Sequence, residues 1–193
     1  YTYSDDSLRL FKDIGDMTDF LINNIELIGG STLLCSSHNG TIYIDTVTGE
    51  TSVTPFNLHN EVSATFTDSK GRIWMSYYNN GIAVFDHNGR ILQRYSTSDS
   101  DLSNDVVLCM TERDSYIWAG TDGGGINIIN PETSEIRVIS HIAGDPSSLP
   151  AHSIKSIYTD EYGNIWAGSI REGLVRISES GMMTYSDSHI GLT

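Results

Sequence analysis

Residues 154–169, IKSIYTDEYGNIWAGS, decide the fold of this chain because their pattern recurs along the sequence. The tryptophan of this stretch, Trp166, has counterparts at Trp118 and Trp74, and Leu33 takes the same position in a degenerate first copy. Each tryptophan is followed seven residues later by a glycine and an aliphatic residue. The glycines are Gly81, Gly125 and Gly173. A constant interior with spacers of variable length is typical of a repeat array.

The third copy gives the clearest view of one repeat. Four short segments rich in β-formers are separated by turn residues, which predicts an antiparallel meander of four strands. The expected strands are 106–111, 116–120, 126–129 and 135–140. Between the second and third strands, residues 122–125 (DGGG) supply glycines for a tight turn.

One such meander buries little apolar surface alone, so neighbouring copies must stack. Radial stacking of four-stranded sheets predicts an all-β fold, a β-propeller segment of about four four-stranded antiparallel blades. Trp74, Trp118 and Trp166 are expected to pack between blades, with the three glycines as structural turn residues. We expect one domain over 1–193, with repeats at about 17–58, 59–102, 103–149 and 150–193, and with 1–16 as a candidate outer strand of a preceding blade.

Charge and composition exclude several classes of function. The net charge is −14, with 25 acidic and 11 basic residues, so the surface repels phosphate backbones and nucleic-acid binding is not expected. Two cysteines cannot form a disulfide framework, and Cys109 lies in an apolar run where a small buried hydrophobe is expected. The sequence contains no recognisable metal-binding or catalytic motif, so we expect no cofactor, no metal site and no catalytic residue.

The motif Val-x-x-x-x-x-Asp-x-x-Gly-x-Ile-Trp-x-Gly-Ser/Thr-x-x-x-Gly-Ile/Leu resembles the two-component regulator propeller repeat. Residues 154–169 and 117–126 carry the best matches, and Leu-Pro at 149–150 resembles the lead-in of such a repeat. Three departures occur, because the first copy lacks the tryptophan, Ser76 replaces a glycine and Glu112 replaces the aspartate. Proteins with these repeats are extracytoplasmic sensors of hybrid two-component systems, typical of gut Bacteroidetes.

That resemblance implies a partial ring of a seven-bladed propeller in the periplasmic part of an inner-membrane hybrid histidine kinase. It implies a non-catalytic segment that recognises glycan-derived oligosaccharides and signals to a kinase outside this chain. The C-terminal residues 187–193 look like the lead-in to a further repeat. Because an open arc exposes blade faces, we also expect homo-oligomers formed through those faces.

The candidate ligand-binding residues lie in loops that a propeller brings to one edge. They are Tyr77, Tyr78, Asn79, Asn80, Asn104, Asp122, His152 and Arg171. Adjacent tyrosines and amides suit the apolar face and hydroxyl rim of a sugar, and Arg171 suits a carboxylate or sulfate. The alternative is that Tyr78 continues its strand into the blade interface and that the two asparagines only form a turn.

Two other functions remain open at this stage. The first is a metal-dependent propeller enzyme that resembles streptogramin lyases, for which His59, His152 and Glu172 are the available side chains. In this reading His59 and His152, which precede equivalent first strands, approach one another near the axis. The second is a scaffold that docks proteins and has no small ligand.

Overall fold

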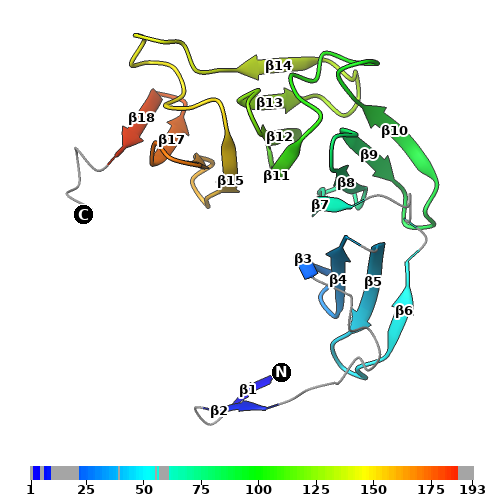
Figure 1. The fold of residues 1–193 in the computed structure, drawn as a ribbon. Coiled ribbons are helices and arrows are strands. Elements are labelled where there is room, and N and C mark those ends of the chain that lie inside the picture. Colours follow the sequence, from blue (N-terminus) through cyan, green and yellow to red (C-terminus); the bar gives the residue numbers. More distant parts are fainter. Residues whose placement is uncertain are drawn as a thin grey trace.

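A computed structural model describes residues 2–4, 7–9, 22–38, 40–54, 56 and 61–186. Within these ranges every regular element is a β-strand, and sixteen of the strands form four antiparallel four-stranded sheets, or blades. Figure 1 shows the blades fanned in an open arc about a common axis. The prediction of an all-β propeller segment is therefore confirmed.

Each blade follows the chain order from the axis to the rim. Blade 1 contains β3 (Ile22–Ile28), β4 (Thr32–Ser37), β5 (Gly40–Asp45) and β6 (Thr51–Val53). Blade 2 contains β7 (Val62–Thr67), β8 (Ile73–Tyr77), β9 (Ile82–Phe85) and β10 (Ile91–Tyr95). Blade 3 contains β11 (Val107–Arg113), β12 (Tyr116–Thr121), β13 (Ile126–Ile129) and β14 (Ile136–Ile139). Blade 4 contains β15 (Ile154–Thr159), β16 (Ile165–Ser169), β17 (Leu174–Ser178) and β18 (Gly181–Tyr185).

All four innermost strands carry an irregularity at the same place. The pairing register shifts after the first residue of β3, β7, β11 and β15, as between Ile154 and Ser156. A bulge bends a strand and increases its twist. The repeat therefore determines the bend of the inner strands as well as the positions of the core residues.

The N-terminal segment contains β1 (Thr2–Ser4) and β2 (Ser7–Arg9), which pair with one another. We expected a single outer strand there. The C-terminal segment 187–193, expected to begin a further repeat, lies outside the described residues. No helix in the described part of the chain is long and apolar enough to cross a membrane.

The hydrophobic core lies between blades, where side chains from facing sheets interdigitate. Trp74 on β8 is 1% exposed and packs with Ile117 and Ala119 of blade 3. Trp118 on β12 is 8% exposed and packs with Ile165 and Ala167 of blade 4. Burial of these large side chains between sheets holds neighbouring blades together.

Trp166 has a different environment, although it occupies the same position in its repeat. It stacks on Tyr185 of β18 with ring centroids 5.9 Å apart, and it is only half-buried. In the ladder of blade 4 it lies opposite Tyr158 on one side and Arg176 on the other. This sheet face is built like an interface between blades, and it carries the exposed Tyr158, Leu174 and Met183.

The three glycines that follow the tryptophans are required by the backbone. Gly125 has φ +76°, a left-handed conformation that side chains disfavour, and a Cβ there would meet the carbonyl oxygen of Ile139 on the neighbouring strand. Gly81 and Gly173 have the same φ sign and the same obstruction, from Tyr95 and Tyr185. Each glycine therefore lets the third and fourth strands of its blade approach closely.

Candidate ligand-binding groove

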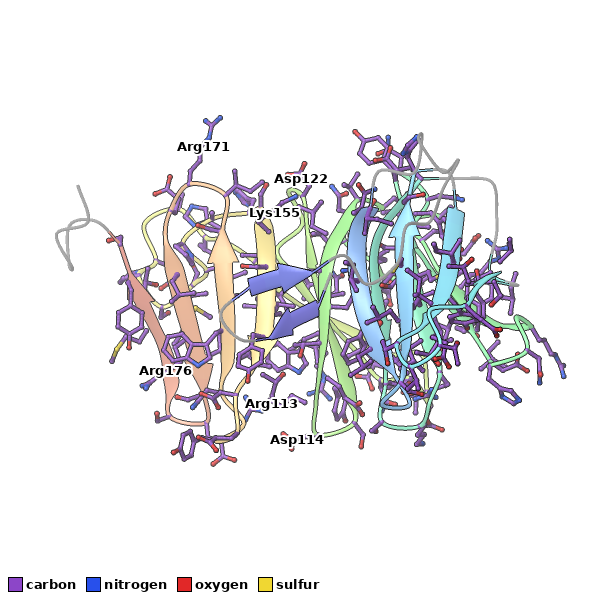
Figure 2. All side chains as sticks on the ribbon, turned by 90° about the horizontal axis from the view of Figure 1, so that it is seen from below. Arg113, Asp114, Asp122, Lys155, Arg171 and Arg176 are labelled. Atoms are coloured by element: carbon purple, nitrogen blue, oxygen red, sulfur yellow. The ribbon has the colours of Figure 1, made fainter. Side chains whose placement is uncertain are left out.

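The loops between blades 3 and 4 line an open cavity of about 390 Å³ at one edge of the arc. In an antiparallel meander, the turn between the second and third strands and the link to the next blade end at the same edge. The cavity is lined by Asp122, Ala151, His152, Ser153, Ile170, Arg171 and Glu172. Figure 2 shows Asp122 and Arg171 at this edge, whereas Arg113 and Asp114 lie at the opposite one. We call this cavity the groove.

Hydrogen bonds across the seam fix the walls of the groove. Ser153 Oγ donates to Asp122 Oδ1 at 2.7 Å, and the Gly125 amide donates to the carbonyl of His152 at 2.7 Å. In blade 4 the amide of Ile170 donates to the Ser153 carbonyl at 3.2 Å. The backbone is thus held, while the side chains of His152 and Arg171 remain exposed.

The groove combines one cation with two carboxylates. Arg171 makes no ion pair within the described part of the chain, so its guanidinium is available for a carboxylate or sulfate in two-point geometry. Asp122 and Glu172 offer acceptor oxygens for hydroxyl groups. This composition favours a polar ligand that presents both hydroxyls and an acidic group.

The structure brings together three of the predicted residues, Asp122, His152 and Arg171, in the groove. Asn104 is not among the lining residues, and its Oδ1 accepts a 2.7 Å hydrogen bond from the amide of Val106. That contact stabilises the link into blade 3. Asn104 therefore has a local structural role.

Tyr77 is a correction to the sequence-based site. Its side chain is 2% exposed, and its hydroxyl donates to the carbonyl of Phe56 at 2.8 Å within the core between blades 1 and 2. Burial also raises the pKa of this phenol well above its ordinary value. Because Tyr77 ends a fully buried strand, its ring cannot stack on a ligand in solvent.

Tyr78, Asn79 and Asn80 form an exposed turn in blade 2, away from the groove lining. Tyr78 is 55% exposed, so it does not continue into the blade interface. Asn79 adopts φ +54°, and the Asn80 amide donates to the Tyr77 carbonyl at 2.9 Å, which is the geometry of a tight turn. These residues are a surface turn with one exposed aromatic ring.

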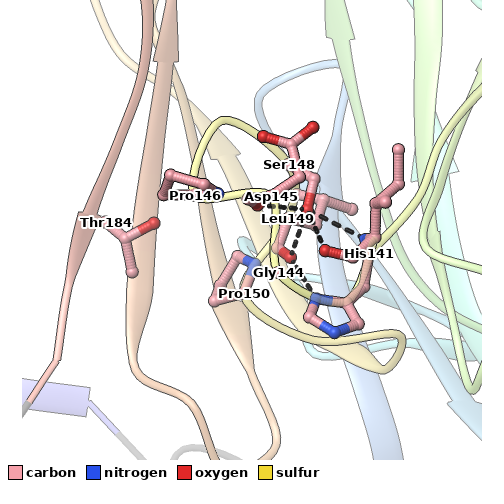
Figure 3. Close-up of a pocket in the computed structure, with 9 residues that line it drawn as sticks. His141, Gly144, Asp145, Pro146, Ser148, Leu149, Pro150 and Thr184 are labelled. Atoms are coloured by element: carbon pink, nitrogen blue, oxygen red, sulfur yellow. Dashed lines mark hydrogen bonds between the residues drawn. The ribbon is translucent and has the colours of Figure 1, made fainter.

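The loop that enters blade 4 forms a second cavity, which no motif in the sequence predicts. It has a volume of about 410 Å³, and Figure 3 shows its lining. The lining residues are His141, Ile142, Gly144, Asp145, Pro146, Ser148, Leu149, Pro150 and Thr184. Ser148 organises the loop, because its hydroxyl accepts from the Ile142 amide at 2.9 Å and donates to the Asp145 carbonyl at 2.8 Å.

The partner of His152 also differs from the expected one. The rings of His141 and His152 meet edge to face, with centroids 4.9 Å apart and planes at 82°. His59, the partner expected from the sequence, lies outside the described residues. No sequence signal links His141 to His152, because the loop between them has no counterpart of the same length in the other repeats.

A third cavity, of about 570 Å³, lies at the opposite edge between blades 1 and 2. Its lining includes Asp45, Glu50 and His87. The Asp45 carboxylate already accepts from the amides of Val47 and Thr48, and these hydrogen bonds lower its pKa. We therefore favour the groove, where Arg171 has no ion-pair partner among the described residues.

The described residues contain no cluster of three or more His, Cys, Asp and Glu side chains placed to hold a metal ion. Four-stranded antiparallel sheets fanned about an axis, with a cavity between loops at one edge, define the chain as a β-propeller segment. Residues 148–171 match the family model described as two component regulator propeller. This match covers the link into blade 4 and strands β15 and β16, and it confirms the resemblance seen in the motif.

Similar solved structures agree with this fold. The extracellular domain of a protein described as the one component system BT4673 from B. thetaiotaomicron has a TM-score of 0.71 at 22% identity, over 90% of this chain and 26% of that chain. That of the hybrid two component system BT3049 from the same organism has a TM-score of 0.56 at 19% identity, over 88% and 28%. An inactive virginiamycin B lyase from Staphylococcus aureus, solved with quinupristin, has a TM-score of 0.67 at 19% identity, over 89% and 57%.

This chain thus spans about a quarter of the length of the two B. thetaiotaomicron domains. At these identities the likeness concerns the fold. Among curated proteins, none matches the sequence.

Proposed function

We propose that this chain is a non-catalytic, ligand-binding segment of an extracytoplasmic sensor in a two-component signalling system. The observation that carries the proposal is the overlap between the family match and the groove. The matched residues 148–171 include five of the seven lining residues, namely Ala151, His152, Ser153, Ile170 and Arg171. The repeat that resembles sensor propellers is therefore also the repeat that supplies most of the groove.

The ligand in this proposal is an oligosaccharide released from a glycan, with a carboxylate or sulfate group. Arg171 would bind the acidic group, and the carboxylates of Asp122 and Glu172 would accept hydrogen bonds from sugar hydroxyls. An acidic group is favoured because the guanidinium of Arg171 has no ion-pair partner among the described residues. A ligand without an acidic group would leave the guanidinium of Arg171 without an anionic partner.

The proposal locates the chain in the periplasm, as part of an inner-membrane protein whose histidine kinase lies outside these 193 residues. The fold likeness to extracellular domains of signalling proteins supports this location. A ligand can shift a signalling equilibrium only if it binds two states with different affinity. The seam between blades 3 and 4 suits this requirement, because a ligand in the groove would contact both blades.

The test is isothermal titration of the chain with matched neutral, uronic-acid-containing and sulfated oligosaccharides. We expect binding of an acidic member, and we expect Arg171→Ala to weaken it at least tenfold, because a charge-assisted two-point contact is lost. Arg137→Ala is the matched control, since Arg137 is also exposed but lies on the rim strand β14. The control variant should bind like the parent chain.

Two outcomes would contradict the proposal. The first is binding of oligosaccharides that Arg171→Ala and Arg137→Ala affect equally, since the groove would then not be the site. The second is the absence of binding across the whole panel, which would favour the scaffold function.

A propeller enzyme remains the second candidate, because His152 and Glu172 line the same cavity and a virginiamycin B lyase has a similar fold. Incubation with quinupristin and a divalent metal ion, followed by mass spectrometry, tests it. A metal-dependent change in the chromatographic retention or in the fragment masses of quinupristin would favour the enzyme over the sensor.

We also propose that the chain self-associates through its blade faces. The face of blade 4 that carries Trp166 exposes Tyr158 by 64% and Met183 by 50%, and β3 exposes Ile25 by 60% and Leu27 by 57%. Sedimentation velocity should show an oligomer that Met183→Glu weakens. A monomer at all concentrations would contradict this part of the proposal.

A further inference from the structure

The geometry points to a second kind of site beside the groove: a two-histidine site for a transition-metal ion, formed by His141 and His152. Neither the family match nor the proposed sensor function assigns this pair a role. The inference depends on the positions of the two imidazoles and does not require a saccharide ligand.

The spacing of the rings suits a shared ion. Zinc–nitrogen bonds are about 2.0–2.1 Å long, so two imidazoles on one tetrahedral zinc ion have ring centroids about 5 Å apart. The centroids of His141 and His152 are 4.9 Å apart, and their planes are nearly perpendicular at 82°. Rotation of the exposed His152 side chain can then direct one of its nitrogens at the same point as a nitrogen of His141.

His141 is already oriented as a metal ligand. Its Nδ1 lies 2.7 Å from the carbonyl oxygen of Leu149, so Nδ1 carries the hydrogen and Nε2 keeps its lone pair. Metal-binding histidines commonly donate their second ring nitrogen to a carbonyl in this way, which fixes the tautomer and the orientation of the ring. This contact leaves Nε2 as the coordinating atom of His141.

The loop holds both histidines before any ion arrives. The backbone of His152 is fixed through its carbonyl, which accepts from the Gly125 amide of blade 3 at 2.7 Å. Around His141, the Ser148 hydroxyl accepts from the Ile142 amide and donates to the Asp145 carbonyl. The backbone of both ligands is therefore ordered before the ion binds, and the His141 ring is also held by its contact with Leu149.

The ligand type and the nearby carboxylates favour a transition-metal cation that binds nitrogen ligands. Asp122 and Glu172 line the same cavity as His152, and the chain has a net charge of −14. Imidazole suits Zn²⁺, Cu²⁺ and Ni²⁺, whereas Mg²⁺ and Ca²⁺ require oxygen ligands. Because the described residues contain no larger cluster, the protein provides two ligands and water completes the coordination.

The test uses the metal ions alone with the tag-free chain. Titration calorimetry with ZnCl₂ should give one site per chain, and MgCl₂ should give none. With Cu²⁺, electron paramagnetic resonance should show two equatorial nitrogens. His152→Ala and His141→Asn should each lower the affinity at least tenfold and leave one nitrogen in the Cu²⁺ spectrum.

The substitutions are matched to the structure. In His141→Asn the amide can still donate to the Leu149 carbonyl, so the loop is kept while Nε2 is lost. His38→Ala is the control, since His38 is exposed in the β4–β5 turn of blade 1. Circular dichroism establishes that each variant is folded.

Two results would overturn the inference. One is the absence of Zn²⁺ and Cu²⁺ binding to the parent chain. The other is a loss of binding in His38→Ala as large as that in His141→Asn and His152→Ala. Neither result would bear on the oligosaccharide titrations, which are carried out without metal.

Discussion

The indole Nε1 of Trp166 donates a 2.8 Å hydrogen bond to Oδ2 of Asp160, the residue that begins the turn before its strand. The same pair recurs in blade 2, where Trp74 donates to Asp68 at 2.9 Å. In both blades the other carboxylate oxygen accepts amide hydrogens of the turn. The Asp-x-x-Gly-x-Ile-Trp motif therefore links a turn to a core residue through one carboxylate.

Blade 3 departs from the motif, and the structure gives the reason. Glu112 lies within β11, opposite Ile117, and the turn is formed by Asp114 and Ser115. Its carboxylate instead accepts from the amide and hydroxyl of Ser69 in blade 2, at 2.6 and 2.7 Å. Trp118 lies next to Arg113, whose guanidinium is 5.9 Å from the indole centroid. Glutamate in place of the motif aspartate therefore replaces a hydrogen bond to the tryptophan of the same blade with hydrogen bonds to Ser69 of the neighbouring blade.

Asp68→Ala should strongly destabilise the chain. Asp68 is buried, accepts from Trp74 and two turn amides, and pairs with Arg72 at 2.6 Å. Removal of one partner of such a buried network costs about 3 kcal/mol of unfolding free energy. Urea unfolding followed by tryptophan fluorescence measures the loss.

The control for this substitution is Asp86→Ala. Asp86 caps a turn of the same blade through the amides of Asn88 and Arg90, but it is less buried and has no indole partner. Its loss should cost about 1 kcal/mol. Equal losses in the two variants would show that the indole and arginine contacts of Asp68 contribute nothing.

Asp160 should make stability depend on pH in the acid range. Hydrogen bonds from the Asn164 side chain and then the Trp166 indole lower the pKa of Asp160 from 3.8 to about 2. Because the folded state holds the proton less tightly, the stabilisation is complete above pH 3.8 and is lost as the pH falls to about 2. The difference in unfolding free energy between the parent chain and Asp160→Asn should shrink across this window, as urea titrations at several pH values can measure. A constant difference would contradict the assignment.

Gly125→Ala should destabilise the chain more than Gly144→Ala. Both glycines have positive φ, +76° and +82°, so each substitution has a backbone cost of about 1 kcal/mol. A Cβ at position 125 would also meet the Ile139 carbonyl, whereas position 144 has no atom within 4 Å. The clash should add about 2 kcal/mol, measured by urea unfolding. If both variants lose the same stability, the sheet relaxes around the added methyl group.

Cys109 should react slowly with thiol reagents in the folded chain. Burial raises the pKa of this thiol to about 12, and its Sγ donates to the Ile154 carbonyl at 3.7 Å. At pH 8 the thiolate fraction is then lower than that of a free cysteine by roughly a thousandfold. In Cys35→Ser, a chromogenic disulfide should label Cys109 only after denaturation. Rapid labelling of the folded variant would show that the strand pair opens.

Much of the fold follows from local rules that the sequence states directly. The tryptophan and glycine positions indicated the second and third strands, since strand alternation and positive φ act within one repeat. The edge on which Asp122 and Arg171 meet was also predictable, because antiparallel strands alternate between two edges. The same rules could not separate Tyr77 from Tyr78. A shift of the strand end by one residue would decide which of these two rings is buried and which is exposed.

The sequence by itself determined the repeat: four strands per unit, their turns, and the residues that must be small or aromatic. Only the tertiary structure decided which side chains meet across a seam, as His141 meets His152 and Ser153 bonds to Asp122. The reason is physical. Contacts within a blade are set by the period of the strand, whereas contacts between blades depend on how two whole sheets are rotated against each other and on the path of the variable loop between them.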